Sequence, residues 1–405
     1  MSDGSAAVAA ATSPQDEATR QREGIPLVVY VLAVTCFMLG TSEFMIAGMM
    51  PTLAQALDVS VPQVGYLISL YAAGMVVGGP ILTALLLRFG FPNKPSLLAL
   101  LAIYVAASIL AASAPTYEIM ATARVLTGVA GSACFGISIS IAAGLVAPDQ
   151  RGRASSIVLG GLMVATVVGV PVATLIDQSF GWRASFWAIV ILAALCAGAV
   201  ALLAPSTKGR AADLSAELTA LRSGRLWAAF ATSGLIMGAT FSAFSYFSPI
   251  FTEVTGLSAS AIPVLLAVYG AATVIGNLVI GYFADRHIFP ILTGGLVALA
   301  VALFLFAVFA DNSLIGVAAF IVIGFAGLPM NPALVARVMR TVPAGPLVNT
   351  THTSVINIGL AFGAWAGGLV IQAGHGLTSP LWIGMGLALV GLLSVAPASA
   401  RRLEP

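Results

Sequence analysis

Three side chains that can carry or exchange charge lie inside long apolar stretches of the sequence: Glu43, Arg124 and His352. Ionisable groups at such positions are costly to bury and often serve function. Burial disfavours an ionised carboxylate, whereas a nearby guanidinium favours it. A carboxyl group whose contact with a cation changes between two conformations can therefore bind and release a proton. Glu43 and Arg124 are predicted to couple a proton in this way; a fixed structural pair is the alternative.

Glu43 and Arg124 lie at similar depth within their apolar stretches. Glu43 is roughly 10 Å, and Arg124 roughly 9 Å, from the end of its stretch that is predicted to face the outside. His352 lies in the stretch NTTHTSVIN together with Asn357. A histidine can titrate near neutral pH, and a hydrogen-bonded structural histidine fits the position equally well. Both residues are predicted to line a cavity.

The sequence lacks the motifs of ATP-binding proteins, proteases and metal-binding proteins. The sequence contains no G-x4-G-K-[ST], and its two lysines precede Pro95 and Gly209, so it does not predict ATP binding. H-E-x-x-H, G-x-S-x-G and a Gly-Asp pair are also absent, which argues against a protease. The three cysteines lie in apolar segments, away from any disulfide or metal pattern. The sequence predicts neither an enzyme nor a cofactor.

The composition identifies the medium that surrounds these residues. Charged residues make up 8% of the 405 positions, against roughly 25% in an ordinary soluble domain. Hydrophobic residues make up 59%, and the mean hydropathy is +1.03. A soluble fold could not cover its surface with so few charges, so lipid is predicted to surround most of the chain. A net charge of +2 leaves no basic footprint for nucleic acid.

Apolar runs of membrane-spanning length recur along the chain, and each must be helical, because hydrocarbon cannot satisfy an open backbone. An all-α membrane protein of about twelve transmembrane helices is therefore expected. The predicted spans are 26–49, 62–87, 96–113, 118–146, 154–178, 182–204, 227–251, 260–284, 290–310, 314–339, 347–374 and 378–400.

The cations predict the orientation. With the N-terminus inside, fifteen of the seventeen Lys and Arg residues fall on the cytosolic side, Arg183 falls outside and Arg124 lies within a span. This bias places both termini in the cytosol. Residues 1–25 are predicted to be a disordered cytosolic tail, and residues 401–405 are predicted to be a cytosolic tail. The outer loops carry acids instead: Asp58, Glu118, Asp177, Glu253 and Asp311.

The longest polar interval, 205–226, divides the chain into six-helix halves, 26–204 and 227–400. It is predicted to be a cytosolic linker with a short amphipathic helix around Leu214–Leu221. Gly78 and Arg88 match Gly276 and Arg286 at an offset of 198, which indicates a duplication. Parallel halves with a site between them are a layout of transporters.

Several motifs carry a resemblance to a known family. GNLVIGYFADR (Gly276–Arg286) resembles the G-x4-D-R loop of the major facilitator superfamily, and RVLTGVAG (Arg124–Gly131) its fourth-helix R-x3-G motif. GGLMVATVVGVP (Gly160–Pro171) is similar to the fifth-helix motif of its proton antiporters. GTSEFMIAGMMP (Gly40–Pro51) and GWRASFW (Gly181–Trp187) narrow the resemblance to bacterial drug:proton antiporters, including the arabinose-efflux-like and chloramphenicol-efflux-like permeases.

The resemblance implies the major facilitator fold and export of a small organic molecule, such as a chloramphenicol-type compound, in exchange for protons. Such a carrier is driven by the proton gradient, needs no cofactor, lies in the bacterial inner membrane and is expected to act as a monomer. Its partners are the small-molecule substrate, protons and the lipid bilayer. Efflux of a sugar, nucleoside or metabolite, a passive uniporter, and a non-transporting membrane sensor are the alternatives.

Two groups of residues are predicted to act in conformational change. The first group lies in the fifth span. Its glycines lack side chains and its proline lacks an N–H, so this helix can bend and approach a neighbouring helix closely. The alternative is that these residues only serve helix packing. The second is the G-x4-D-R loop, whose first-half copy has Leu87 where the family has Asp. The predicted residues are Gly160, Gly161, Gly169, Pro171, Gly276, Gly281, Asp285 and Arg286.

A third group is predicted to line the substrate cavity. Methionine and aromatic side chains form adaptable apolar walls, although such residues more often fill the core or face lipid. Buried polar tips need partners, which favours a tyrosine and an asparagine in the second and eighth spans. With His352 and Asn357, the predicted cavity residues are Met38, Tyr71, Phe241, Phe244, Tyr246 and Asn277.

Overall fold

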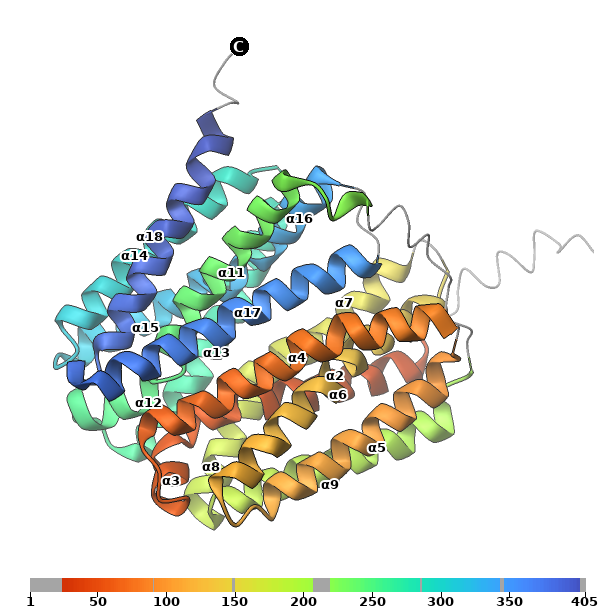
Figure 1. Ribbon diagram of the computed structural model, residues 1–405, viewed down its shortest axis with the longest axis horizontal. Coiled ribbons are helices and arrows are strands. Elements are labelled where there is room, and N and C mark those ends of the chain that lie inside the picture. Colours follow the sequence, from red (N-terminus) through yellow and green to blue (C-terminus); the bar gives the residue numbers. More distant parts are fainter. Residues whose placement is uncertain are drawn as a thin grey trace, which may run out of the picture.

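The computed structural model describes residues 24–89, 91–147, 150–206, 219–284, 286–342 and 346–400, and every regular element within these ranges is helical (Figure 1). Eleven helical stretches in this part of the chain are long and apolar enough to cross a membrane. The apolar helix Ser379–Val395 belongs to the last predicted span. The prediction of an all-α membrane protein is confirmed.

Each predicted span has its counterpart in the structure. The elements are α2 (Leu27–Gly48), α4 (Val61–Phe89), α5 (Asn93–Ala112), α6 (Tyr117–Gly144), α7–η2–α8 (Arg151–Val164, Ala165–Gly169, Val170–Phe180), α9 (Trp182–Leu203), α11–α12–η3 (Gly224–Phe244, Phe247–Pro249, Ile250–Val254), η4–α13 (Ala259–Ala261, Ile262–Ala284), α14 (Ile288–Val308), α15–η5–α16 (Ser313–Ala326, Leu328–Met330, Asn331–Thr341), α17–η6 (Pro346–Val370, Ile371–His375) and α18 (Ser379–Ala400).

Several predicted spans are more irregular than the hydropathy pattern indicates, and the fifth and tenth are examples. The fifth contains a π-helical turn, Ala165–Gly169, directly before Pro171. The tenth is interrupted at Gly327 by a 3₁₀ turn, because Pro329 and Pro332 have no N–H for a continuous helix. A short helix that was not predicted, α3 (Met50–Ala56), follows α2.

The helices pack as two groups. α2 and α4–α9 pack mainly against one another, as do α11–α18. The groups meet along α4 and α17, which run side by side through the centre of Figure 1, and where η2 and α8 pack against α13. The linker predicted at 205–226 stays a prediction, since residues 207–218 lie outside the described part of the chain, as does most of the predicted helix around Leu214–Leu221.

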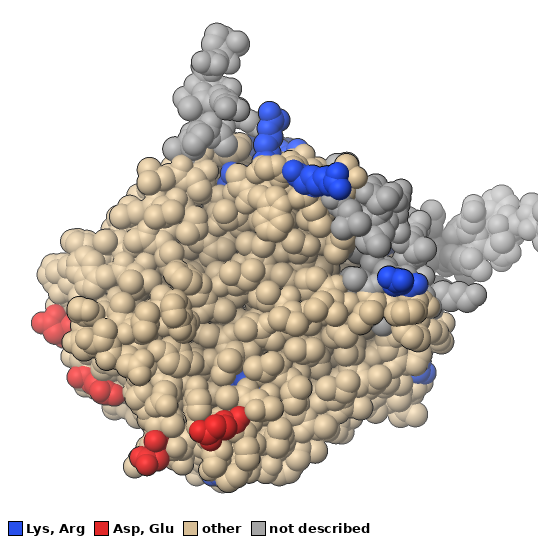
Figure 2. All heavy atoms as spheres, viewed as in Figure 1, with Lys and Arg blue, Asp and Glu red and all other residues tan. Residues whose placement is uncertain are grey.

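Charged side chains gather at opposite ends of the molecule. In Figure 2 the visible acids lie at the lower left and most visible cations at the upper right. The acidic end carries the loops that follow α2, α5, α8, η3, α14 and η6, and the basic end the loops that follow α4, α6, α9, α13 and α16. Arg183 is an exception at the acidic end, where its Nη2 donates to the Ala114 carbonyl at 2.8 Å.

Glycines set the spacing between α4 and α6. A Cβ at Gly128 would overlap the main-chain carbonyl oxygen of Tyr71, and one at Gly74 would overlap that of Val125. The two backbones are therefore in direct contact, as small residues allow in membrane helices. This contact brings Tyr71 of α4 against the same face of α6 as Arg124.

Replacing Gly128 with Ala is expected to lower the free energy of unfolding by about 1–3 kcal/mol, because the new methyl group forces the helices apart. The matched control is Gly136→Ala in the same helix, where a Cβ meets nothing within 4 Å. That change should leave stability equal or raised by up to about 1 kcal/mol through helix propensity. Thermal unfolding of the purified variants in detergent measures both; equal midpoints would contradict the expectation.

Candidate functional site

The structure brings Arg124 against α2 at Glu43. Arg124 is 1% exposed and Glu43 is 7% exposed. Nη1 of Arg124 donates to the Ser42 carbonyl at 2.9 Å, and Nη2 donates to the Glu43 carbonyl at 3.2 Å. The predicted pair is thus close in space, but the guanidinium hydrogen-bonds to the main chain beside Glu43 rather than to its carboxylate.

The Glu43 carboxyl group interacts with side chains of two other helices. Arg124 and Tyr71 lie close enough to interact with it electrostatically. Among the described residues, no hydrogen bond holds the carboxylate in place. A change in its protonation therefore breaks no hydrogen bond within this part of the chain.

Two tyrosines complete the surroundings of Arg124. The guanidinium carbon lies 4.2 Å from the ring centroid of Tyr71, in a cation–π contact. Tyr104 of α5 is fully buried nearby. Tyr71 was predicted to line the substrate cavity, and the structure places it with Arg124. Sequence reasoning missed Tyr104, although a phenol hydroxyl inside an apolar span was a signal that could have found it.

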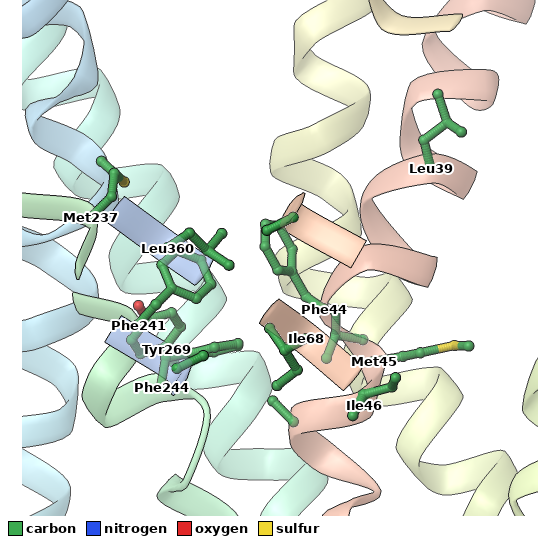
Figure 3. Close-up of a cluster of buried hydrophobic side chains, with 14 of the residues drawn as sticks. Leu39, Phe44, Met45, Ile46, Ile68, Met237, Phe241, Phe244, Tyr269 and Leu360 are labelled. Atoms are coloured by element: carbon green, nitrogen blue, oxygen red, sulfur yellow. The ribbon is translucent and has the colours of Figure 1, made fainter. Parts of the chain in front are cut away.

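Aromatic side chains join the two groups of helices at the same level. The rings of Phe44 and Phe241 stack with centroids 5.5 Å apart, and Phe244 meets Phe44 edge to face at 6.2 Å. Tyr269 of α13 contacts Phe244 at 5.0 Å. Figure 3 shows Phe44 and Ile68 on one side facing this second-half cluster on the other. The predicted cavity residues Phe241 and Phe244 thus lie where the halves meet.

Other predicted cavity residues lie apart from this cluster. Tyr246 packs between α4 and α17 near the acidic end and donates to the Ala364 carbonyl at 2.6 Å. Met38 of α2 is buried in the hydrophobic core, and Asn277 of α13 is half-buried. Asn357 donates to the Thr353 carbonyl at 3.0 Å within α17. The structure does not gather these four side chains into one cavity.

His352 has the environment of a structural histidine. Its Nε2 lies 2.8 Å from the Ser233 hydroxyl, and its ring stacks on Phe230 with centroids 5.2 Å apart. It is 4% exposed, inside the second half toward the basic end. The contact joins α17 to α11, away from Glu43.

Arg337 is a buried cation that sequence reasoning did not single out. It is one of the fifteen cations counted on the predicted cytosolic side, and it is 9% exposed within α16. Its Nη1 donates to the Thr232 hydroxyl at 2.9 Å, and that hydroxyl lies 2.8 Å from the Ser394 hydroxyl. Arg337 thus lies on the face of the helix 331–341 that packs against α11. A count of charges along the sequence does not show on which face of a helix a residue lies.

The fifth-span motif is split between two roles. Gly161 and Gly169 bring this span against α2, at Ala33 and Thr41. A Cβ at Gly160 would meet nothing within 4 Å, so this glycine makes no close approach among the described residues. Pro171 follows the π-helical turn, whose Thr166 backbone is in close contact with Gly270 of α13. This wide turn therefore lies at the interface between the halves.

The second predicted motif is only partly described. Gly276 lets α13 approach the Phe325 carbonyl and Pro329, whereas a Cβ at Gly281 would lie 3.9 Å from the Pro332 ring, an ordinary contact. Arg286 is exposed at the basic end, and Asp285 lies outside the described residues. Leu87, the departure from the motif, has no described side chain.

The comparison with known proteins identifies the family. Residues 32–348 match the Major Facilitator Superfamily. The chain belongs to this superfamily. It is 32% identical to the chloramphenicol resistance protein of Streptomyces lividans over 92% of this chain and 96% of that protein. It is 33% identical to the inner membrane transport protein YdhP of Escherichia coli strain K12, over the same shares of the two chains.

Among solved structures, the POT family transporter PepTSo superposes with a TM-score of 0.79, at 10% identity, covering 95% of this chain and all of that one. This likeness concerns the fold alone. Membership of the superfamily makes the protein a multi-pass membrane transporter and not an enzyme, as the sequence predicted.

The π-helical turn generates a prediction for Pro171→Ala. The alanine supplies an N–H to the carbonyl one turn earlier, which favours a regular helix over a wide, adaptable turn. Amide hydrogen exchange in the segment 160–175 is expected to slow. Pro263→Ala is the matched control, because Pro263 lies in the first turn of α13, where its missing N–H matters little. Unchanged exchange in Pro171→Ala would contradict this role for the proline.

Proposed function

We propose that this protein exports small organic molecules of the chloramphenicol type in exchange for protons, by alternating access. The chloramphenicol resistance protein that it resembles over most of its length supports the substrate class. The buried Glu43 carboxyl group, next to Arg124 at the level where the halves meet, supports the coupling to protons. Arg124 acts by holding α2 at this carboxyl group.

The observation that carries the proposal is the adjacency of Glu43 and Phe44 on α2. Glu43 lies beside Arg124 and Tyr71 in the first half. Phe44 stacks on Phe241 of the second half. A change in the charge of Glu43 alters the forces on the same helical turn that contacts the other half. Proton binding and the arrangement of the halves are thereby linked, and such linkage is reciprocal.

The energetics suit an exporter. One proton moving through a potential of about 100 mV supplies roughly 2.3 kcal/mol. That free energy sustains about a fifty-fold concentration gradient of an uncharged substrate. A pH gradient adds to this force, and no bound cofactor is needed.

The proposed setting is the inner membrane of a bacterial cell, with the basic end in the cytosol. The K/R bias supports this orientation. In the cycle, substrate enters from the basic end and leaves at the acidic end, and protons move in the opposite direction. The proposed partners are the substrate, protons and lipid, with the chain acting as a monomer.

Replacing Glu43 with Gln is expected to abolish chloramphenicol uptake driven by a pH gradient into inverted membrane vesicles, since the amide cannot bind or release the proton. Glu253→Gln is the matched control, because Glu253 is an exposed acid at the acidic end. Its flux should equal that of the native protein. Native proton-driven flux in Glu43→Gln would overturn the assignment.

The orientation is tested by labelling single cysteines. The three native cysteines are buried and should give little background. In intact cells, a membrane-impermeant maleimide is expected to label Asp311→Cys at the acidic end. Arg222→Cys, at the basic end, should be labelled only after the membrane is opened. The reverse pattern would place the basic end outside.

A further inference from the structure

Buried polar atoms without hydrogen-bond partners gather in the first half, on α4, α5 and α6. Within the described part of the chain they include the hydroxyls of Tyr71 and Tyr104 and the Nε of Arg124. The three side chains are at most 1% exposed. Such an atom destabilises the fold when it is left unsatisfied, because it has lost its hydrogen bonds to water. Because three such atoms lie in one region, a single small polar molecule could satisfy them together.

These atoms converge beside Gly131. A Cβ at this position would lie 3.0 Å from the Tyr71 hydroxyl and 3.5 Å from Cε2 of Tyr104. The guanidinium carbon of Arg124 lies over the Tyr71 ring at 4.2 Å. The two hydroxyls lie near each other, and that of Tyr104 lies near Ser42, without forming hydrogen bonds of good geometry. The rings of Tyr71 and Tyr104 therefore both approach α6 at Gly131, which has no side chain to separate them.

The same face of α6 continues toward the basic end. Arg124, Gly131 and Ser138 are spaced by seven residues, so they form one stripe along this helix. Each step along the stripe covers roughly 10 Å. The Ser138 hydroxyl is also buried without a partner among the described residues. Buried polar groups without partners therefore occur both at the level of Arg124 and nearer the basic end along this face of α6.

The interface between the halves offers a contrasting environment at the same level. Phe44, Phe241 and Phe244 pack together there with Ile68 and Leu360, and all five are buried. These five side chains have no group that can accept or donate a proton, whereas the phenol of Tyr269, which contacts Phe244, lies on the second-half side. Arg124 and Tyr71, which interact electrostatically with Glu43, lie on the first-half side.

We propose that Tyr71, Tyr104 and Arg124 form a buried site that holds water and passes the coupled proton between Glu43 and the basic end, inside the first half. Water suits such a place, because a buried water typically makes two to four hydrogen bonds to otherwise unsatisfied groups. This inference rests on the proposed function, since it concerns the route of the same proton.

The transfer balances without any oxidant or reductant. The O–H bond of the Glu43 carboxyl group breaks, and its proton forms a new O–H bond on a water molecule. That water passes one of its protons to the Tyr104 hydroxyl oxygen, which gives up its own proton to the next water toward Ser138. This second water hands the extra proton on to bulk water at the basic end. The intermediate waters and Tyr104 then hold as many protons as before, and Glu43 has lost one and is ionised next to Arg124.

The test is Tyr104→Phe, which removes one hydroxyl and keeps the ring. The purified protein is reconstituted in liposomes that contain a pH-sensitive dye, with chloramphenicol as the probe. Two rates are measured: proton movement that accompanies chloramphenicol transport, and exchange of labelled for unlabelled chloramphenicol at equal pH. The ratio of the first rate to the second is expected to fall several-fold in Tyr104→Phe. The control Tyr30→Phe changes an exposed tyrosine and should keep the native ratio.

The outcomes separate this inference from the proposed function. A native ratio in Tyr104→Phe, or an equal fall in both rates, overturns the proton route, because the phenol would then be dispensable or merely structural. If Glu43→Gln loses proton movement at the same time, the proposed function still stands. Native proton movement in Glu43→Gln overturns both proposals.

Discussion

The hydrogen bonds from Arg124 to the carbonyls of Ser42 and Glu43 are the interaction on which the site depends. A guanidinium is costly to place in an apolar interior unless its N–H groups and its charge find partners. Here two N–H groups find main-chain acceptors on α2 and the charge finds the face of Tyr71. Because these partners belong to α2 and α4, one side chain of α6 fixes three helices around the carboxyl group of Glu43.

Small residues make this arrangement possible. Gly128 lets the backbones of α4 and α6 touch, and Gly161 does the same for the fifth span and α2. Gly169 leaves room for the Thr41 side chain of α2. The π-helical turn at Ala165–Gly169 then contacts Gly270 of the second half. A Cβ at these glycines would overlap atoms of the neighbouring helix. These glycines therefore act by allowing a close approach of helices that a larger residue would prevent.

The two halves use their buried polar groups differently. In the first half the charges lie toward the acidic end, around Glu43 and Arg124. In the second half Arg337 donates to Thr232, and His352 meets Ser233, both nearer the basic end. The two halves thus share a helical plan but differ in the chemistry placed on it. The proposed proton-coupling site, which lies in one half and faces an aromatic surface of the other, agrees with this asymmetry.

The sequence by itself determined the membrane class, the predicted spans and the separation of acidic from basic loops, because hydropathy and charge act locally along each helix. It also placed Glu43 and Arg124 at one depth, since rise per residue is constant in a helix. Only the tertiary structure decided that Arg124 bonds to carbonyls rather than to the carboxylate, that Tyr104 joins it, and that Arg337 turns inward. These contacts depend on the rotation and separation of neighbouring helices, which arise from packing between segments distant in the chain.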